Sequence, residues 1–170
     1  KNVIENCSNE LNILNLKLKI PKSKYLSYDE AIKLCKLKYM DDFSPEDERK
    51  LCEMFLDTII FTHSWPISLK PFYILPKDKK LSKGFDALYN GIEISSGGQR
   101  VHIPEILVKQ LKDKGLNPKN FEFYVNSFKF GSPLHSGWSI GLERFTMALL
   151  KLDNIREACL FPRDRERLTP

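Results

Sequence analysis

The chain has 170 residues, of which 42% are hydrophobic and 29% are charged, and its 27 lysines and arginines outnumber its 22 acidic residues to give a net charge of +5. This balance excludes disordered and fibrous proteins and is typical of one globular domain with a substantial core. No segment approaches the ~20 apolar residues of a membrane helix or resembles a signal peptide, so we expect a cytoplasmic protein. The four cysteines lack CxxC spacing, which disfavours a zinc site and favours reduced thiols.

The first third of the chain carries three helix signals. Apolar residues at steps of three and four predict an amphipathic helix over about residues 2–14. Ser27-Tyr28-Asp29-Glu30 reads as a capping box that opens a second helix. Ser44-Pro45-Glu46-Asp47 combines a cap, a proline at the first helical position and acidic residues, so a third helix is expected to run to about Phe55.

The middle of the chain changes to β-branched and aromatic runs. We predict strands over residues 58–62, 72–75, 85–89 and 91–95. Residues 77–83, four of which are lysines, are expected to form an exposed loop.

Helical signals return in the last third. Helices are predicted from Pro104 to about Lys114 and from Asn117-Pro118 onward, followed by a loop rich in glycine, serine and proline over 131–139 and a buried helix over 140–150. Helices first, then strands interleaved with helices, indicate an α+β fold in which an antiparallel β-sheet is flanked by helices.

One segment matches the serine-hydrolase pattern G-x-S-x-G, at Gly137-Trp138-Ser139-Ile140-Gly141. A nucleophile elbow needs a preceding core strand and, in the α/β-hydrolases, a histidine later in the chain. All three histidines precede Ser139, and the residues before it are predicted to be a loop. The order of the histidines and the predicted loop therefore disfavour a hydrolase, despite the matching pattern.

The run Glu93-Ile94-Ser95-Ser96-Gly97-Gly98-Gln99-Arg100 offers a carboxylate, a hydroxyl and a guanidinium within one strand and turn. The glycine pair could form a bulge that swings Ser96 toward the side of Glu93. A carboxylate with a hydroxyl suits Mg²⁺, and an arginine suits a substrate carboxylate. The alternative is a surface ion pair between Glu93 and Arg100 beside a glycine turn.

The segment from Gly137 to Arg144 pairs closely spaced glycines with the start of a helix. Glycines let a nucleotide approach the backbone, and Arg144 could reach anionic oxygens. The alternative is a tight loop packed on the sheet with a solvated Arg144.

These signals occur in an order that resembles a known family. Residues 135–144, His-Ser-Gly-Trp-Ser-Ile-Gly-Leu-Glu-Arg, resemble motif 3 of the class II aminoacyl-tRNA synthetases. The ending from Asn154 through Phe161-Pro162-Arg163-Asp164 to Pro170 is similar to that of aspartyl-tRNA synthetases of the archaeal and eukaryotic type, and Pro71-Phe72-Tyr73, Phe85-Asp86 and residues 93–102 match in the same order.

The resemblance implies an ATP- and Mg²⁺-dependent ligase that activates L-aspartate as aspartyl-adenylate and transfers it to the 3′ end of tRNA(Asp). Arg144 and Glu93 are then the catalytic candidates, and the resemblance assigns the other roles by position. The ATP site would take Glu93, Gly141, Leu142, Glu143 and Arg144; aspartate would contact Ser96, Arg100, Tyr73 and Asp86; Mg²⁺ would bind Glu93 and Ser96. His135 falls near the amino acid and adenine, and we expect the acid, the hydroxyl and the two arginines to converge on one hollow.

The resemblance also implies that residues 1–170 are the C-terminal portion of a synthetase catalytic domain. Motif 3 is present, whereas motif 1, which builds the homodimer, motif 2, which supplies the α-phosphate arginine, and the anticodon-binding domain are not found. We therefore expect a fragment that is inactive alone and that leaves a sheet edge unpaired. Two alternatives stay open: an asparaginyl-tRNA synthetase or asparagine-synthetase-like relative of the same fold, and a non-catalytic binding module.

Overall fold

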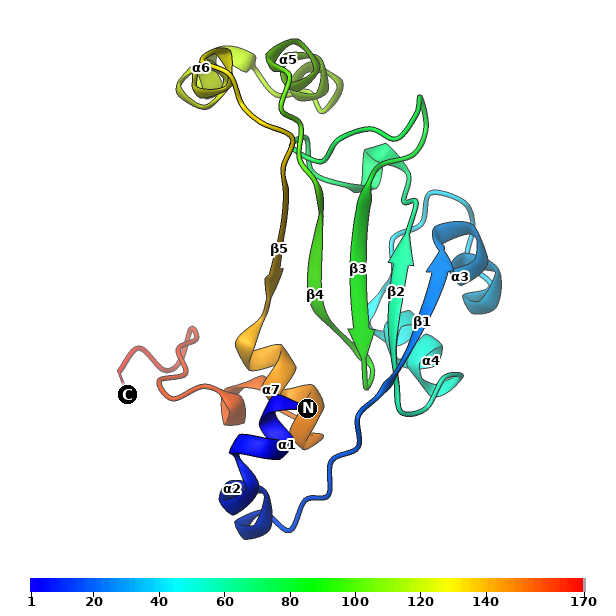
Figure 1. Cartoon of the computed structure of the whole chain (residues 1–170), viewed down its shortest axis with the longest axis vertical. Helices are drawn as coiled ribbons and strands as arrows, with labels where there is room; N and C mark the ends of the chain where they lie inside the picture. Colours follow the sequence, from blue (N-terminus) through cyan, green and yellow to red (C-terminus); the bar gives the residue numbers. More distant parts are fainter. Residues whose placement is uncertain (170) are drawn as a thin grey trace.

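Five strands form the sheet at the centre of the computed structural model, which describes residues 1–169 (Figure 1). They lie side by side in chain order: β1 (Lys22–Ser27), β2 (Thr58–His63), β3 (Gly84–Tyr89), β4 (Ile92–Gln99) and β5 (Ser136–Ile140). The β1–β2 pair is parallel, and the other three pairs are antiparallel. The expected α+β fold is confirmed, and β5 forms one edge of the sheet within the described residues.

Seven α-helices flank the sheet within residues 1–169: α1 (Asn2–Asn6), α2 (Ser8–Ile13), α3 (Tyr28–Cys35), α4 (Pro45–Glu53), α5 (Pro104–Asp113), α6 (Glu122–Lys129) and α7 (Leu142–Leu150). Both predicted capping boxes are present. The Ser27 and Ser44 hydroxyls accept the backbone N–H groups of Glu30 and Asp47, whose carboxylates accept the N–H groups of the two serines in return.

The two faces of the sheet are covered by different helices. On one face, α3 and α4 pack on Ile60 and Leu88 through a core that includes Leu51 and Cys52. On the other face, α7 packs on another cluster: Ala87, Tyr89, Ile94 and Ala148, with Phe145 and Leu149 beside it. Helices α5 and α6 form a separate small core at the end of β4 and β5 (Figure 1). No α-helix of the described part of the chain covers the face under α3 and α4 in the region between these two helices and the α5–α6 pair (Figure 1).

Three predicted elements differ from the structure. Residues 72–75 form no strand, only a single bridge from Ile74 to Arg100, because Pro71 and Pro76 flank them and Phe72 and Leu75 pack on α5 and α6. Residues 136–140 form β5 instead of a loop, since pairing with β4 outweighs their weak strand propensity. The buried helix expected from residue 140 begins at Leu142, and of its residues only Ala148 is buried.

The N-terminal segments also depart from expectation. The helix predicted over residues 2–14 is broken at Cys7 into α1 and α2. Asn6, Ser8 and Asn9 surround the break, and such side chains compete for backbone hydrogen bonds. Strand β1 was not predicted, because its exposed lysines and serines give no apolar alternation.

No helix within residues 1–169 is long and apolar enough to cross a membrane. The four cysteines are free thiols, and Cys35 and Cys52 are buried in the core under α3 and α4. Pro170, the last residue of the family resemblance, lies outside the described residues.

Candidate functional site

A bulge in β4 decides which side chains face the open surface of the sheet. Leu88 pairs with Glu93, but Ala87 pairs with Ser95, so Ile94 is an extra residue in β4. Side chains that pair across antiparallel strands share a face, which places Glu93 on the face of Leu88 and Ser96 on the face of Asp86. These two faces are the same one, because Asp86 and Leu88 are two residues apart on β3. The expected grouping of Glu93 with Ser96 is therefore produced by a bulge, although it lies at Ile94 and not at the glycine pair.

Arg100 follows β4 and lies flat against β5. Its guanidinium carbon is 4.5 Å from the centre of the Tyr73 ring. A side chain at Gly137 would meet the Arg100 Nε and Nη2 atoms at 2.9 Å, so any larger residue would displace the guanidinium from this position. Gly137 therefore makes room for Arg100 within a strand, in place of the expected role in a nucleotide-binding turn. The His135 carbonyl accepts the Arg100 backbone N–H at 3.0 Å, which brings His135 beside this group through its backbone.

Arg144 meets Glu93 from the other side of the site. Its Nη1 atom lies 3.9 Å from Glu93 Oε1 and donates to the Glu93 carbonyl oxygen at 3.4 Å. The Arg144 side chain is 51% exposed and that of Glu93 is 31% exposed, so both remain accessible to a ligand. This juxtaposition unites the two catalytic candidates, which are 51 residues apart in the chain.

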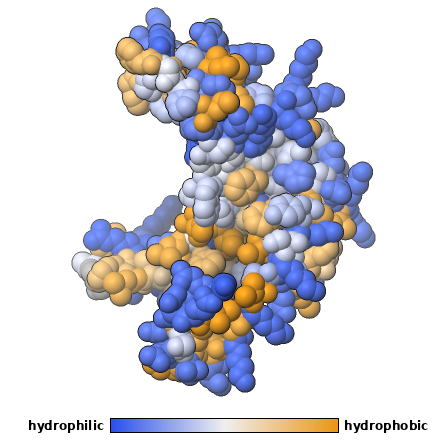
Figure 2. All heavy atoms as spheres, in the orientation of Figure 1, coloured by the Kyte–Doolittle hydropathy of each residue, from blue (hydrophilic) through white to orange (hydrophobic). Residues whose placement is uncertain are grey.

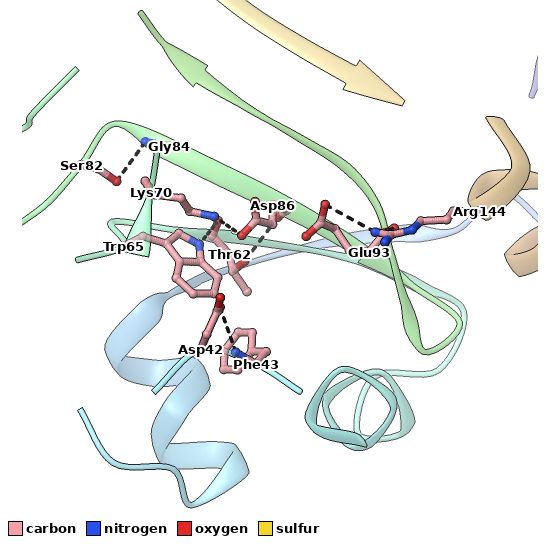
Figure 3. A network of polar contacts seen from close by, with 10 residues as sticks. All are labelled: Asp42, Phe43, Thr62, Trp65, Lys70, Ser82, Gly84, Asp86, Glu93 and Arg144. Carbon is pink, nitrogen blue, oxygen red and sulfur yellow. Dashed lines mark hydrogen bonds and ion pairs between the residues drawn. The ribbon is translucent and has the colours of Figure 1, made fainter. Parts of the chain in front are cut away.

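Asp86 is held by a buried ion pair. The ammonium of Lys70 contacts the Asp86 carboxylate and lies 4.0 Å from the centre of the Trp65 ring. Figure 3 shows the side chains of Lys70, Asp86, Glu93 and Arg144 one after another along this face, with the two carboxylates between the two cations.

Negative charge is concentrated around Glu93. Burial raises the pKa of Glu93 above the ordinary carboxyl range, and the carboxylates of Asp86 and Glu48 raise it further. Burial also raises the pKa of Asp86 and of Glu48, although Lys70 opposes the shift of Asp86 and the hydrogen bond from the Glu93 backbone opposes that of Glu48. A cation bound beside Glu93 would relieve this repulsion.

The remaining ATP-site candidates lie where β5 passes into α7. Gly141 is the N-cap of α7, and Leu142, Glu143 and Arg144 form its first turn, all exposed. The N–H groups of a helix start favour phosphate oxygens. Glu143 adds a negative charge to that turn, so Arg144 is the residue suited to an anion.

The sequence candidates form an elongated row and do not all touch. Glu93 and Arg100 are seven residues apart on an extended strand, which corresponds to roughly 20 Å at ~3.3 Å per residue. Ser96 lies between them, in register with Asp86 and Ser139. A cavity of about 660 Å³ between α4, the β3–β4 turn and α7 includes Arg144 and Glu48 in its wall, but not Glu93, Ser96 or Arg100. Beside β5 the surface is hollowed between the α5–α6 pair and the α7 region (Figure 2).

Two residues of this group, Lys70 and Glu48, are not among the candidates predicted from the sequence. Lys70 directly precedes the matched Pro71-Phe72-Tyr73, and that adjacency is the signal that could have drawn attention to it. Glu48 follows the capping box of α4, so its charge resembles an ordinary acid in a first helical turn.

Comparison with known proteins decides the family. Residues 1–165 match the model of the tRNA synthetases class II (D, K and N). The chain belongs to this family. It is 42% identical to the aspartate–tRNA(Asp/Asn) ligase of Methanocaldococcus jannaschii, over 99% of this chain and 40% of that protein. It is 44% identical to the aspartate–tRNA(Asp) ligase of Thermococcus kodakarensis, over 99% of this chain and 41% of that protein.

Solved structures of the same family share the fold. The aspartyl-tRNA synthetase of Entamoeba histolytica superposes with a TM-score of 0.90 at 34% identity, over 99% of this chain and 38% of that one. The asparaginyl-tRNA synthetase of Pyrococcus horikoshii superposes with a TM-score of 0.89 at 32% identity, over 98% of this chain and 43% of that one. The chain therefore spans about 40% of the length of its curated relatives.

Proposed function

We propose that residues 1–170 form the C-terminal portion of the catalytic domain of an aspartate–tRNA ligase. The enzyme would join L-aspartate to ATP, release pyrophosphate, and transfer the aspartyl group to the 3′ end of tRNA(Asp). The observation that carries the proposal is the row of charged side chains on the open face of the sheet, in a chain more than 40% identical to ligases of that name. An elongated row suits an elongated intermediate in which an amino acid is joined to a nucleotide.

In the activation step, a carboxylate oxygen of aspartate attacks the α-phosphorus of ATP and pyrophosphate leaves. No proton has to be removed from an ionised carboxylate, so catalysis rests on positioning and on neutralising phosphate charge. Arg144 would meet the phosphates near the γ position, assisted by the exposed start of α7 at Gly141, Leu142 and Glu143. Glu93 would touch ATP beside it.

At the other end of the row, Arg100 would hold the side-chain carboxylate of aspartate through paired N–H bonds. Its contact with the Tyr73 ring and its seat on Gly137 fix the plane of the guanidinium, which lowers the entropy lost on binding. Ser96 and Asp86 lie on the same face between the two ends and would contact the amino acid.

The residues present also fit Mg²⁺. Glu93 sits among carboxylates that raise its pKa, and Ser96 adds a hydroxyl on the same face. One carboxylate and one hydroxyl suit Mg²⁺, which keeps most of its coordination places for water and phosphate. Bound Mg²⁺ would supply charge neutralisation at the phosphate oxygens, with Glu93 and Ser96 as its protein ligands.

The closest competing proposal is an asparagine-specific enzyme, because an asparaginyl-tRNA synthetase shares the fold as closely as an aspartyl one. A cationic Arg100 favours a carboxylate over a carboxamide, and the curated relatives at 42–44% identity are named for aspartate. A non-catalytic module has no need to retain Glu93, Ser96, Arg100 and Arg144 together.

The rest of the active site would come from polypeptide beyond these residues. The edge of β5, hollowed and lined by exposed Trp138 and Ile140, is where further strands and an α-phosphate arginine would join. We also propose a homodimer and a cytoplasmic location for the complete enzyme, while the 170-residue chain alone would not activate aspartate.

The test is amino-acid-dependent exchange of pyrophosphate into ATP, with the protein isolated at the length its source cell makes. Aspartate should support exchange and asparagine should not. Exchange with asparagine alone would assign the enzyme to the other specificity, and no exchange with either would favour the binding module.

A further inference from the structure

A carboxylate outside the matched motifs reaches the centre of the site. Glu48 lies on α4, and its Oε2 atom accepts the backbone N–H of Glu93 at 3.1 Å. The Glu93 carbonyl oxygen and carboxylate both face Arg144 Nη1, at 3.4 and 3.9 Å. One residue of β4 is thus held from two sides, by α4 through its N–H and by α7 through its C=O.

The held residue adjoins the point where the strand is irregular. Glu93 immediately precedes the bulge at Ile94, where a backbone N–H loses its regular partner in the neighbouring strand. A buried N–H without an acceptor is costly, and Glu48 supplies the acceptor. The bulge in turn keeps Glu93 on the same face as Ser96 and Asp86.

Helix α4 is anchored firmly enough to act as a support. Leu51 and Cys52 are buried in the core beneath the sheet. The β3–β4 turn packs closely on the same helix, because a side chain at Gly91 would meet Arg49 Cγ at 2.9 Å. Burial raises the pKa of Glu48 above the ordinary carboxyl range, so its carboxylate is not a fully solvated surface acid.

We propose that Glu48 is a positioning residue, which fixes the Glu93 bulge and so sets the place of the Glu93 carboxylate against Arg144. This role rests on the function proposed above, since its consequence for turnover requires an adenylate-forming site. Glu48 touches no substrate here; it acts through the backbone of Glu93.

The experiment compares Glu48→Ala, Glu48→Gln and the control Glu46→Ala in the natural-length protein. Glutamine keeps an oxygen acceptor for the Glu93 N–H, whereas alanine removes it; Glu46 is an exposed acid on the same helix. We expect Glu48→Ala to lower the kcat of pyrophosphate exchange by roughly tenfold to a hundredfold, because small misplacements of reacting groups cost that much. Glu48→Gln should recover most of the loss, and Glu46→Ala should match the wild type.

A second measurement separates this proposal from the function itself. Hydrogen exchange of the Glu93 amide, followed in the natural-length protein, should accelerate at least tenfold in Glu48→Ala and remain slow in Glu48→Gln. Equal exchange rates in all variants would overturn the positioning role of Glu48, and so would a wild-type kcat in a folded Glu48→Ala protein. The wild-type protein could also lack aspartate-dependent activity while its Glu93 amide exchanges slowly and that of Glu48→Ala exchanges rapidly. This result would support the Glu48 hydrogen bond and reject the proposed ligase function.

Discussion

Arg144 and Glu93 are adjacent in space although neither is close to the other in the chain. The guanidinium and the carboxylate lie 3.9 Å apart and are 51% and 31% exposed, so the guanidinium keeps N–H groups that a phosphate could reach. A weak exposed ion pair adds little to stability. Its value lies in the ligand that it would receive.

Removal of either group should therefore harm catalysis far more than folding. On the proposed roles, we expect Arg144→Ala and Glu93→Ala each to lower aspartate-dependent pyrophosphate exchange by at least about a hundredfold, since Arg144 would neutralise phosphate charge and Glu93 would hold Mg²⁺. Lys109→Ala, an exposed change on α5, serves as the control and should keep wild-type exchange. Wild-type rates in Arg144→Ala would show that the site is assigned wrongly.

Lys70 and Asp86 behave differently, because their side chains are only 12% and 8% exposed. Lys70→Met would leave the Asp86 carboxylate buried without its partner, at a cost of about 3–5 kcal/mol in the free energy of unfolding. Lys19→Met breaks an exposed pair with Asp57 and should cost less than about 1 kcal/mol. Chemical denaturation measures the free energy of unfolding of the two variants. Equal losses would contradict the larger cost expected for the buried Lys70–Asp86 pair.

At the scale of the element, the two capped helix starts are encoded locally, whereas β5 and the segment 72–75 depend on their tertiary surroundings. Both capping boxes lie where the sequence places them, because a serine and an acid three residues later satisfy the same two N–H groups in any context. Strand β5 contains Gly137 and Ser139, which favour loops, and only its pairing with β4 makes it a strand. The segment 72–75 has strand-like residues but packs its aromatic side chains under α5 and α6.

The capping box of α3 yields a stability prediction. Ser27→Ala removes the acceptor for the Glu30 N–H and should cost about 1 kcal/mol at neutral pH. Ser127→Ala on α6, whose hydroxyl donates only to the carbonyl of Tyr124, should be nearly neutral. Thermal unfolding of the two variants against the wild type measures this difference.

The same box has a defined pH dependence. The Ser27 hydroxyl and then the Ser27 backbone N–H lower the pKa of Glu30, so this carboxylate stabilises the fold above its ordinary pKa and loses that effect as the pH falls through the lowered value. The gap between wild type and Ser27→Ala should therefore narrow in acid. A gap that widens on acidification would contradict the assignment.

At the scale of the whole molecule, the sequence led to the fold class and to the residue types of the site, and the structure supplied their arrangement. Glu93 and Ser96 share a face because of a bulge at Ile94, and an apolar residue within a strand gives no sequence signal for a bulge. Lys70 and Glu48 belong to the site through contacts with residues 16 and 45 positions away, and the one local signal is that Lys70 directly precedes the matched Pro71-Phe72-Tyr73. The sequence suggests that Gly137 belongs to a nucleotide-binding turn. Its contact with Arg100 could not be predicted, because the two residues approach each other only when β5 lies beside β4.

The open face is also where the molecule depends on more than these 170 residues. Strand β3 carries Asp86, β4 carries Glu93 and Ser96 and leads to Arg100, and β5 ends the sheet beside them within the described residues. A ligand that spans this row would contact groups from both of its ends at once.

A crystal structure of the natural-length protein with L-aspartate and a non-reactive ATP analogue tests this directly. We predict that the aspartate side-chain carboxylate lies within hydrogen-bond distance of the Arg100 guanidinium and the distal phosphates lie at Arg144, with Glu93 between them. Nucleotide bound instead in the cavity between α4 and α7, or aspartate held away from Arg100, would contradict it.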